Sequence, residues 1–323
     1  MSAIPTVDSR LLTIRNDCGL SGVFSAYGAG VKSLTLNGLP LVLDPLDENE
    51  YFTSERFYGK TLGRTAGRIP STINIAGKTC HLPENEPGIC LHGGALDSLA
   101  FKTYSVSIDS NDPECTSVIF NYLSKDGENG FPGNLNVTIT YSLCHSRNEL
   151  MIRQEAVTDQ VTWVSLSNHM YFLLPGSRNV NEHSLQINSS KVSQSDPGEL
   201  IVKRYVDLPQ SLSFKEPSNL KERLDSLPKG STIDNAFVFD SYDSKIPQVI
   251  LENEKYRLEC YTDYPSANIY VQSGDKGEDF ANGKHLKTRR GIAIEPQLTP
   301  LSDITLRPGV KYSHYIKYCI KEK

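Results

Sequence analysis

A long succession of short strand-like segments constrains this chain more than any other feature. Segments rich in Val, Ile, Thr and Tyr, alternating or running apolar over four to eight residues, lie at 117–123, 135–143, 150–157, 256–264, 268–272 and 312–320. Clusters of Gly, Pro, Asn and Asp separate several of them, as at 126–133. This pattern is typical of antiparallel strands joined by turns.

Helical periodicity is scarce by comparison. The best candidate is 218–227, where Ser218 is placed to cap the first turn and Pro228 lies just beyond the end. The segment 56–64 indicates another helical turn or two. Strand signals continue from about residue 10 to residue 320 without alternating strands and helices. We therefore predict an all-β fold, a large antiparallel sandwich, formed by a single domain over 1–323.

Charge and composition exclude several classes of protein. Lys and Arg number 33 against 38 Asp and Glu, a net charge of −5, which argues against nucleic acid or an anionic membrane as partner. The densest basic patch comprises Lys284, Lys287, Arg289 and Arg290, which we interpret as a solvated loop. No run approaches the roughly 18 apolar residues of a membrane helix.

The first residues carry neither the basic nor the apolar region of a secretory signal. The cysteines number seven, an odd count, and none are in C-x-x-C spacing. Free thiols in a reducing compartment fit this usage, so we expect a cytoplasmic protein. The sequence does not indicate an oligomeric state.

Two histidines and one glutamate stand out as candidates for acid–base chemistry. His92 precedes two glycines, which permit close approach of a ligand, and His169 interrupts an apolar strand pattern. Glu295 ends the apolar run 291–294. Burial there would raise its pKa and suit it to act as a base. The other histidines, which we interpret as surface or packing residues, are His81, His145, His183, His285 and His314.

Position alone leaves other polar residues ambiguous. Asp234 before an apolar run is either a turn cap or a ligand for hydroxyl groups, and Arg68 is either a salt-bridge residue or a site residue. No histidine pair has metal-ligand spacing, and the glycines at 63–67 lack the Lys-Ser/Thr of a phosphate loop. The G-x-S-x-G pattern of a serine hydrolase is absent as well.

Taken together, six motifs in order along nearly the whole chain resemble the aldose 1-epimerase (galactose mutarotase) family. The segment 63–69 is similar to G-R-x-A-N-R-I, 91–94 to L-H-G-G, 167–172 to T-N-H-S-Y-F, 233–237 to a D-x-x-F segment, 265–270 to P-G-x-Q-F-Y, and 292–297 to L-A-L-E-x-Q. The resemblance implies the family's all-β supersandwich. It also implies interconversion of the α and β anomers of a free aldose such as glucose or galactose, without metal or cofactor.

The resemblance also implies roles for individual residues. Glu295 would be the base and His169 the acid, while the substrate would be held by Arg68, His92, Asp234 and Asn268. Tyr171 or Phe237 would offer an aromatic surface. Two positions depart from the family pattern, since Gly67 replaces an asparagine and Asn268 a glutamine. Both changes bear on which sugar is preferred.

Four alternatives stay open from the sequence. A hexose-6-phosphate epimerase would need an arginine cluster, and near the motifs we find Arg64, Arg68 and the pair Arg289–Arg290. A disaccharide epimerase, for example of maltose, would use the same chemistry. A glycoside hydrolase would need two catalytic carboxylates, and a non-catalytic sugar-binding module would need neither His169 nor Glu295.

Overall fold

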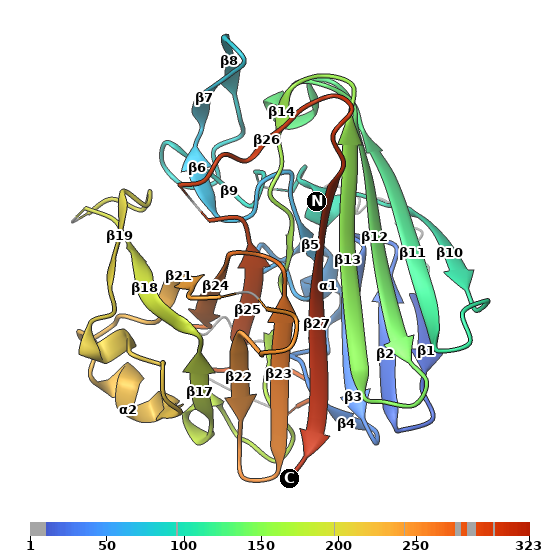
Figure 1. Ribbon diagram of the computed structural model, residues 1–323, viewed down its shortest axis with the longest axis vertical. Helices are drawn as coiled ribbons and strands as arrows, with labels where there is room; N and C mark the ends of the chain where they lie inside the picture. Colours follow the sequence, from blue (N-terminus) through green and yellow to red (C-terminus); the bar gives the residue numbers. More distant parts are fainter. Residues whose placement is uncertain are drawn as a thin grey trace.

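The computed structural model describes residues 11–94, 96–196, 198–241, 243–274, 279–282, 289–299 and 301–323. Within them, every pair of named strands is antiparallel. No helix of this described part is long and apolar enough to cross a membrane. The molecule is built from broad twisted sheets; the two α-helices of the described residues are short, and α2 lies at one edge (Figure 1).

The largest sheet has nine strands, and the last strand in the sequence lies in its middle (Figure 1). Its spatial order is β10 (Ser105–Asp109), β11 (Cys115–Ser124), β12 (Leu135–Cys144), β13 (Glu149–Thr158), β27 (Tyr312–Glu322), β23 (Tyr256–Thr262), β22 (Val249–Glu252), β17 (Ser184–Ile187) and β20 (Ser218–Asn219). Long strands with one apolar face explain why the sequence pattern was strongest here.

A second sheet of six strands packs against the first. Its order is β16 (Tyr171–Phe172), β25 (Ile292–Gln297), β24 (Ser266–Val271), β21 (Asp234–Phe239), β18 (Ser189–Gln194) and β19 (Arg204–Asp207). Tyr318 of β27 donates a hydrogen bond to the Ile294 carbonyl of β25 at 3.0 Å, and its ring lies 4.9 Å from that of Phe172. The main hydrophobic core therefore lies between the two sheets.

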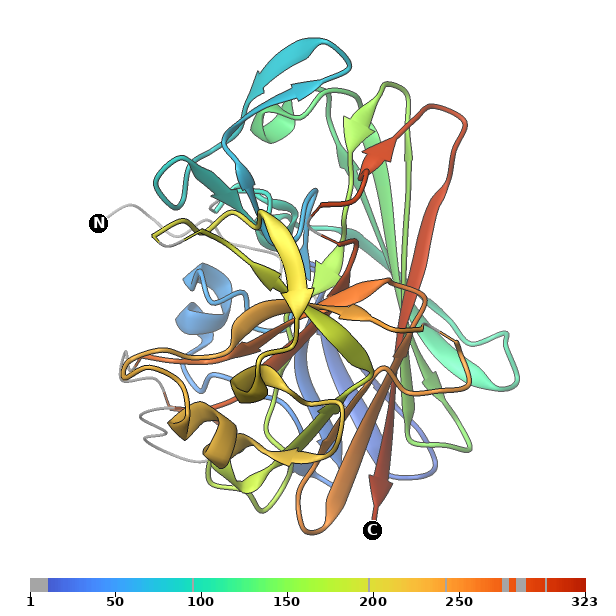
Figure 2. The same cartoon turned by 60° about the vertical axis from the view of Figure 1, so that its left-hand side comes forward.

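Smaller sheets complete the described architecture (Figure 2). Four strands form a separate sheet, namely β1 (Leu11–Arg15), β2 (Leu20–Ser25), β3 (Gly30–Leu36) and β4 (Leu39–Pro40). The two-stranded pairs are β5 (Thr61–Leu62) with β15 (Ser167–Asn168), β6 (Arg68–Pro70) with β9 (Ile89–Leu91), β7 (Thr72–Ile75) with β8 (Lys78–His81), and β14 (Thr162–Trp163) with β26 (Thr305–Leu306).

The six predicted strand segments correspond to β11, β12, β13, β23, β24 and β27, with ends that differ by up to two residues. The helix predicted at 218–227 is shorter: α2 spans Leu220–Asp225 and Asn219, not Ser218, caps it. A helical turn within 56–64 was wrong, because Phe57 has φ 56° and Gly59 φ 63°, values that no α-helix contains. The helix there is α1 (Glu48–Thr53), which lies just before.

Candidate active site

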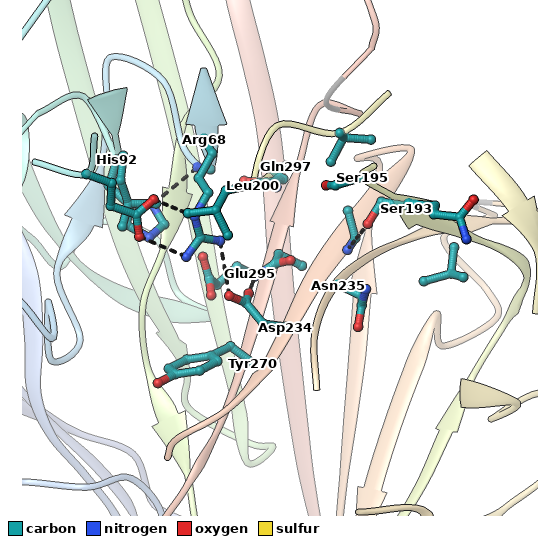
Figure 3. A pocket seen from close by; sticks show the side chains of 18 of the residues that line it. Arg68, His92, Ser193, Ser195, Leu200, Asp234, Asn235, Tyr270, Glu295 and Gln297 are labelled. Atoms are coloured by element: carbon teal, nitrogen blue, oxygen red, sulfur yellow. Dashed lines mark hydrogen bonds and ion pairs between the residues drawn. The ribbon is translucent and has the colours of Figure 1, made fainter. Parts of the chain in front are cut away.

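The floor of a large pocket is the outward face of three neighbouring strands, β21, β24 and β25. Direct register partners point to the same side of a sheet, and here Asp234 faces Tyr270, Asn268 faces Glu295, and Ser266 faces Gln297. Alternate residues of β25 (Ile292, Ile294) join the core between the sheets. We call Asp234, Asn268, Tyr270, Glu295 and Gln297 the pocket floor (Figure 3).

Loops from the other sheets supply the walls. His169 lies between β15 and β16, and its backbone is fixed at both groups: its N–H donates to the Lys60 carbonyl and its carbonyl accepts from Gly59, both at 2.9 Å. The ring of Phe57 lies 5.0 Å from that of His92 and 6.1 Å from that of His169, so both imidazoles are held against an aromatic wall.

The pocket has a volume of about 710 Å³, within the range of small-molecule sites. It is lined by all six residues that the sequence analysis assigned to the site, Arg68, His92, His169, Asp234, Asn268 and Glu295. Nε2 of His169 lies 3.5 Å from Oε1 of Glu295. Groups at this separation can act on adjacent atoms of one bound molecule. The catalytic and binding roles of the six stay predictions.

Burial displaces the titration of the central pair in opposite directions. Both side chains are almost completely enclosed. Loss of water, reinforced by the charge of Asp234, raises the pKa of Glu295 to about 8, against a smaller opposing effect of Asn268 and Arg68. Burial lowers the pKa of His169 to about 4. Between these values the pair holds one proton, which rests on Glu295.

His92 is fixed in one tautomer by its neighbour. Its Nδ1 accepts a hydrogen bond from the Gly67 N–H at 3.2 Å. Burial, His169 and Arg68 keep its pKa well below the usual value, so the ring is neutral and its proton lies on Nε2. His92 therefore presents an N–H donor.

His92, His169 and Glu295 also form a group whose possible ligand atoms lie within 4.8 Å of one another, close enough to surround a metal ion. Metal ligation by histidine uses the lone pair of a neutral ring nitrogen. In His92 the Nδ1 lone pair already accepts from Gly67, and Nε2 carries the proton. The donor set therefore fits hydrogen bonding better than metal binding.

Arg68 is the centre of a charged network at the rim. It donates to both oxygens of Glu86, at 2.7 and 3.1 Å, and to Asp234 at 3.0 Å. Asn268 donates to the other oxygen of Asp234 at 3.1 Å. Burial disfavours the charge on Arg68, but the two carboxylates outweigh it and raise the pKa of Arg68. Glu86, which the sequence analysis did not single out, thus orients a predicted binding residue.

Several sequence interpretations need correction. Phe237 is fully buried in the core and does not line the pocket, whereas Tyr171 does. Arg290 is completely buried, so it does not belong to a solvated loop; Lys284 and Lys287 lie outside the described residues. Of the five histidines set aside, His285 also lies outside them, and none of the other four lines the pocket.

Sequence reasoning missed further pocket residues, among them Arg56, Phe57, Glu86, Tyr270 and Gln297. Two of them were within reach of the strand pattern. Tyr270 lies two residues after Asn268, and Gln297 two after Glu295, so each shares a face with a predicted site residue. Phe57 and Arg56 lie in irregular chain, where no periodic pattern in the sequence indicates which way a side chain points.

Comparison with known proteins places this architecture in a family. The family model for aldose 1-epimerase matches residues 10–319. The aldose 1-epimerase of Escherichia coli K12 is 28% identical, over 96% of this chain and 94% of that protein. The human galactose mutarotase is 29% identical, over 82% and 79% respectively.

Solved structures agree with this match. An aldose epimerase homologue from C. elegans superposes with a TM-score of 0.87 at 28% identity, covering 97% of this chain and 99% of that one. The galactose 1-epimerase of Lactobacillus acidophilus gives a TM-score of 0.87 at 25% identity, covering 97% and 94%. These neighbours confirm the predicted all-β, galactose mutarotase-like fold. With its sequence matched over nearly its full length, this chain belongs to the aldose 1-epimerase family.

Proposed function

We propose that this protein interconverts the α and β anomers of a free aldose such as glucose or galactose. The observation that carries the proposal is the pair of buried groups Glu295 and His169, 3.5 Å apart, which line a pocket of sugar-compatible size. Relatives named aldose 1-epimerase and galactose mutarotase support it. The identity of about 28% supports the reaction class more strongly than any particular sugar.

The reaction needs one proton to leave the C1 hydroxyl and another to reach the ring oxygen. Glu295 takes the proton from O1 while His169 gives one to O5, so the C1–O5 bond breaks and an open-chain aldehyde forms. Rotation about C1–C2 presents the other carbonyl face, and the reverse transfers close the ring. Each well-placed acid or base contributes roughly 10²–10⁴ in rate.

Without substrate the shared proton lies on Glu295, whereas the series of proton transfers just described begins with that proton on His169. Sugar hydroxyls entering the pocket donate hydrogen bonds to the carboxylate and replace the water that burial removed. Such bonds stabilise the ionised form of Glu295. Substrate binding thereby moves the shared proton toward His169, and the pair keeps one proton throughout.

Positioning falls to the remaining candidates. His92 offers its Nε2–H, the tautomer that its bond with Gly67 enforces, to a sugar oxygen. Arg68, held by Glu86, and Asp234, held by Asn268, are oriented toward substrate hydroxyls before substrate arrives. A site whose groups are already fixed avoids an ordering cost on binding.

The charge of the pocket favours an unphosphorylated sugar. Five carboxyl groups line it, Glu55, Glu86, Glu199, Asp234 and Glu295, against the arginines Arg56 and Arg68. Arg68 is already paired with two of those carboxylates. A phosphate dianion therefore meets no arginine cluster. Glucose 6-phosphate should have a much lower kcat/KM than glucose; an equal or higher value would favour the phosphosugar epimerase.

The decisive experiment replaces the pair. Glu295→Gln removes the base and His169→Asn the acid, with little change in size. Each substitution should lower kcat by roughly 10²–10⁴ while KM changes little. The rates are measured by polarimetry on fresh α-glucose, α-galactose and maltose. The double variant should lose less than the sum of the two in free energy. Calorimetry should detect sugar binding by all three.

Wild-type protein that leaves the optical rotation of these sugars at the spontaneous rate would overturn the proposal. Binding without acceleration would instead indicate a sugar-binding module. Release of nitrophenol from an aryl glycoside would indicate a hydrolase.

A further inference from the structure

Gln297, a pocket residue, has no role in the mechanism above, and its side-chain oxygen has no hydrogen-bond partner among the described residues. Gln297 is only 2% exposed and lines the pocket two residues beyond Glu295 on the same face of β25 (Figure 3). Its Oε1 accepts no hydrogen bond from the described residues. Buried amide oxygens are usually satisfied, and in a pocket wall a bound ligand can supply the missing hydrogen bond.

A gap beside Gln297 adds an independent observation. Gly67, with φ 78°, approaches the side chain: a Cβ at this position would lie 3.4 Å from Nε2 and 3.6 Å from Oε1 of Gln297. Because Gly67 has no side chain, nothing of its own occupies the space in front of that amide. Gly67 therefore lies beside the amide at the pocket wall, and no side chain at position 67 separates the amide from the pocket.

The same glycine ties this gap to the reacting centre. The backbone N–H of Gly67 donates to Nδ1 of the His92 ring, and the Gly67 carbonyl accepts from the backbone N–H of His92 at 3.0 Å. Glu295 lies one strand repeat from Gln297, about 7 Å along the backbone. A sugar whose C1 lies over Glu295 thus has ring hydroxyls other than O1 within reach of the Gln297 amide.

We propose that Gln297, which lines the pocket beside Gly67, is a specificity-determining residue that hydrogen-bonds one hydroxyl of the sugar other than O1. The amide offers both an acceptor and a donor, so it matches a hydroxyl, which can donate and accept. A site built around such a bond discriminates against sugars that lack that hydroxyl or present it in another orientation. This inference rests on the proposed function and names a determinant of its sugar preference.

The test compares Gln297→Met with wild type on glucose and on its 2-, 3-, 4- and 6-deoxy derivatives. On glucose the variant should lose about tenfold in kcat/KM, the value of one hydrogen bond of about 1.4 kcal/mol. For one deoxy sugar, the one lacking the partner hydroxyl, wild type and variant should be equal. For the other deoxy sugars the tenfold loss should persist.

Gln272→Met is a matched control. Gln272 is also fully buried with an unpartnered Oε1, but its Nε2 donates to Tyr58 at 3.2 Å and it does not line the pocket. Any loss in this variant should be the same for every sugar. The same uniform pattern in Gln297→Met, or no loss at all, would overturn the proposal.

Filling the gap gives a second arm. Gly67→Asn places a polar side chain against Gln297 at a backbone angle that asparagine tolerates better than most residues. In that background Gln297→Met should no longer change the preference among deoxy sugars, whereas the smaller Gly67→Ala should leave its effect in place. An unchanged Gln297 effect in Gly67→Asn would contradict the role of the gap.

Failure of the proposed function is distinguishable from failure of this inference. If wild type does not accelerate mutarotation, the same sugars and variants are compared by calorimetry. Loss of affinity in Gln297→Met for glucose, and not for one deoxy sugar, would still support the inference; equal affinity throughout would overturn it.

Discussion

Two buried polar regions of this molecule contrast sharply. Around Arg64, which is 2% exposed, every guanidinium nitrogen has a partner: Ser124, Thr162 and the carbonyls of Ser124, Lys125, Pro132 and Gly133. We call this the Arg64 cluster. In the pocket floor, by contrast, both oxygens of Glu295 and one of Gln297 accept no hydrogen bond from the described residues.

The contrast separates polar groups that serve the fold from those that serve a ligand. Satisfied buried groups hold irregular chain together, whereas unsatisfied ones cost stability, and in a pocket a ligand can satisfy them. Arg68 is intermediate between the two regions. Its guanidinium is paired with two carboxylates, as in the Arg64 cluster, but it lies at the pocket rim and its side chain is 25% exposed. Substitutions in each region should therefore affect stability and activity in different proportions.

The largest effect is expected in the Arg64 cluster. Arg64→Met removes all donors and leaves several buried carbonyls unpaired, which should cost about 3 kcal/mol or more of unfolding free energy, measured by urea denaturation. Burial lowers the pKa of Arg64 only to about 10, so the native residue is charged at neutral pH. Arg64→Lys should recover only part of the loss, because an ammonium has three donors. Unchanged unfolding free energy in both variants would contradict a stabilising role for the Arg64 cluster.

Arg68→Met should show the opposite balance. We expect kcat/KM for glucose to fall about 100-fold, because a positioned donor at the reacting sugar is lost. Unfolding free energy should change by less than about 1 kcal/mol, since the ion pairs are partly exposed. A loss of stability comparable to that of Arg64→Met would place Arg68 among the structural residues.

Glu295→Gln should stabilise the protein while it lowers kcat by roughly 10²–10⁴. The pKa of Glu295 is raised to about 8 from an ordinary 4.5, so the folded state binds the proton more tightly than the unfolded state. Ionisation then costs stability progressively as pH rises from 4.5 to 8. The variant should gain on wild type by roughly 2 kcal/mol between pH 5 and pH 7. A constant difference across this range would contradict the raised pKa.

The smallest effect concerns pH and activity. Because His169 titrates at about 4 and Glu295 at about 8, kcat/KM should be level between these values and fall outside them. The positive charge of Arg68 lowers the pKa of Glu295, so Arg68→Met should move the alkaline limb upward, by about one unit or less. A downward movement would mean that Arg68 does not act on Glu295 through its charge.

The strand pattern predicted the fold well because it records burial directly. Segments such as 135–143 alternate over a full strand and correspond to β12. Short elements escaped: α1 has six residues, too few to display a helical period. Left-handed backbone at Phe57 likewise leaves no trace in a search for periodicity.

The site was predictable only where a motif carried it. Sequence treats Arg64 and Arg68 alike, four positions apart, yet one is enclosed by carbonyls and the other faces the pocket. The path of the chain after residue 64 decides which of the two arginines lines the pocket, and Glu86 from another segment then orients Arg68. Such long-range partners are not encoded in local spacing.

The central place of β27 in the nine-stranded sheet bears on how the chain comes to be folded. During synthesis β13 and β23 are made well before β27, and their facing edges have no partner until it emerges. Exposed edges of this kind invite pairing with other chains. Until β27 is inserted, a nascent chain therefore carries the sheet as two parts, each with an open edge.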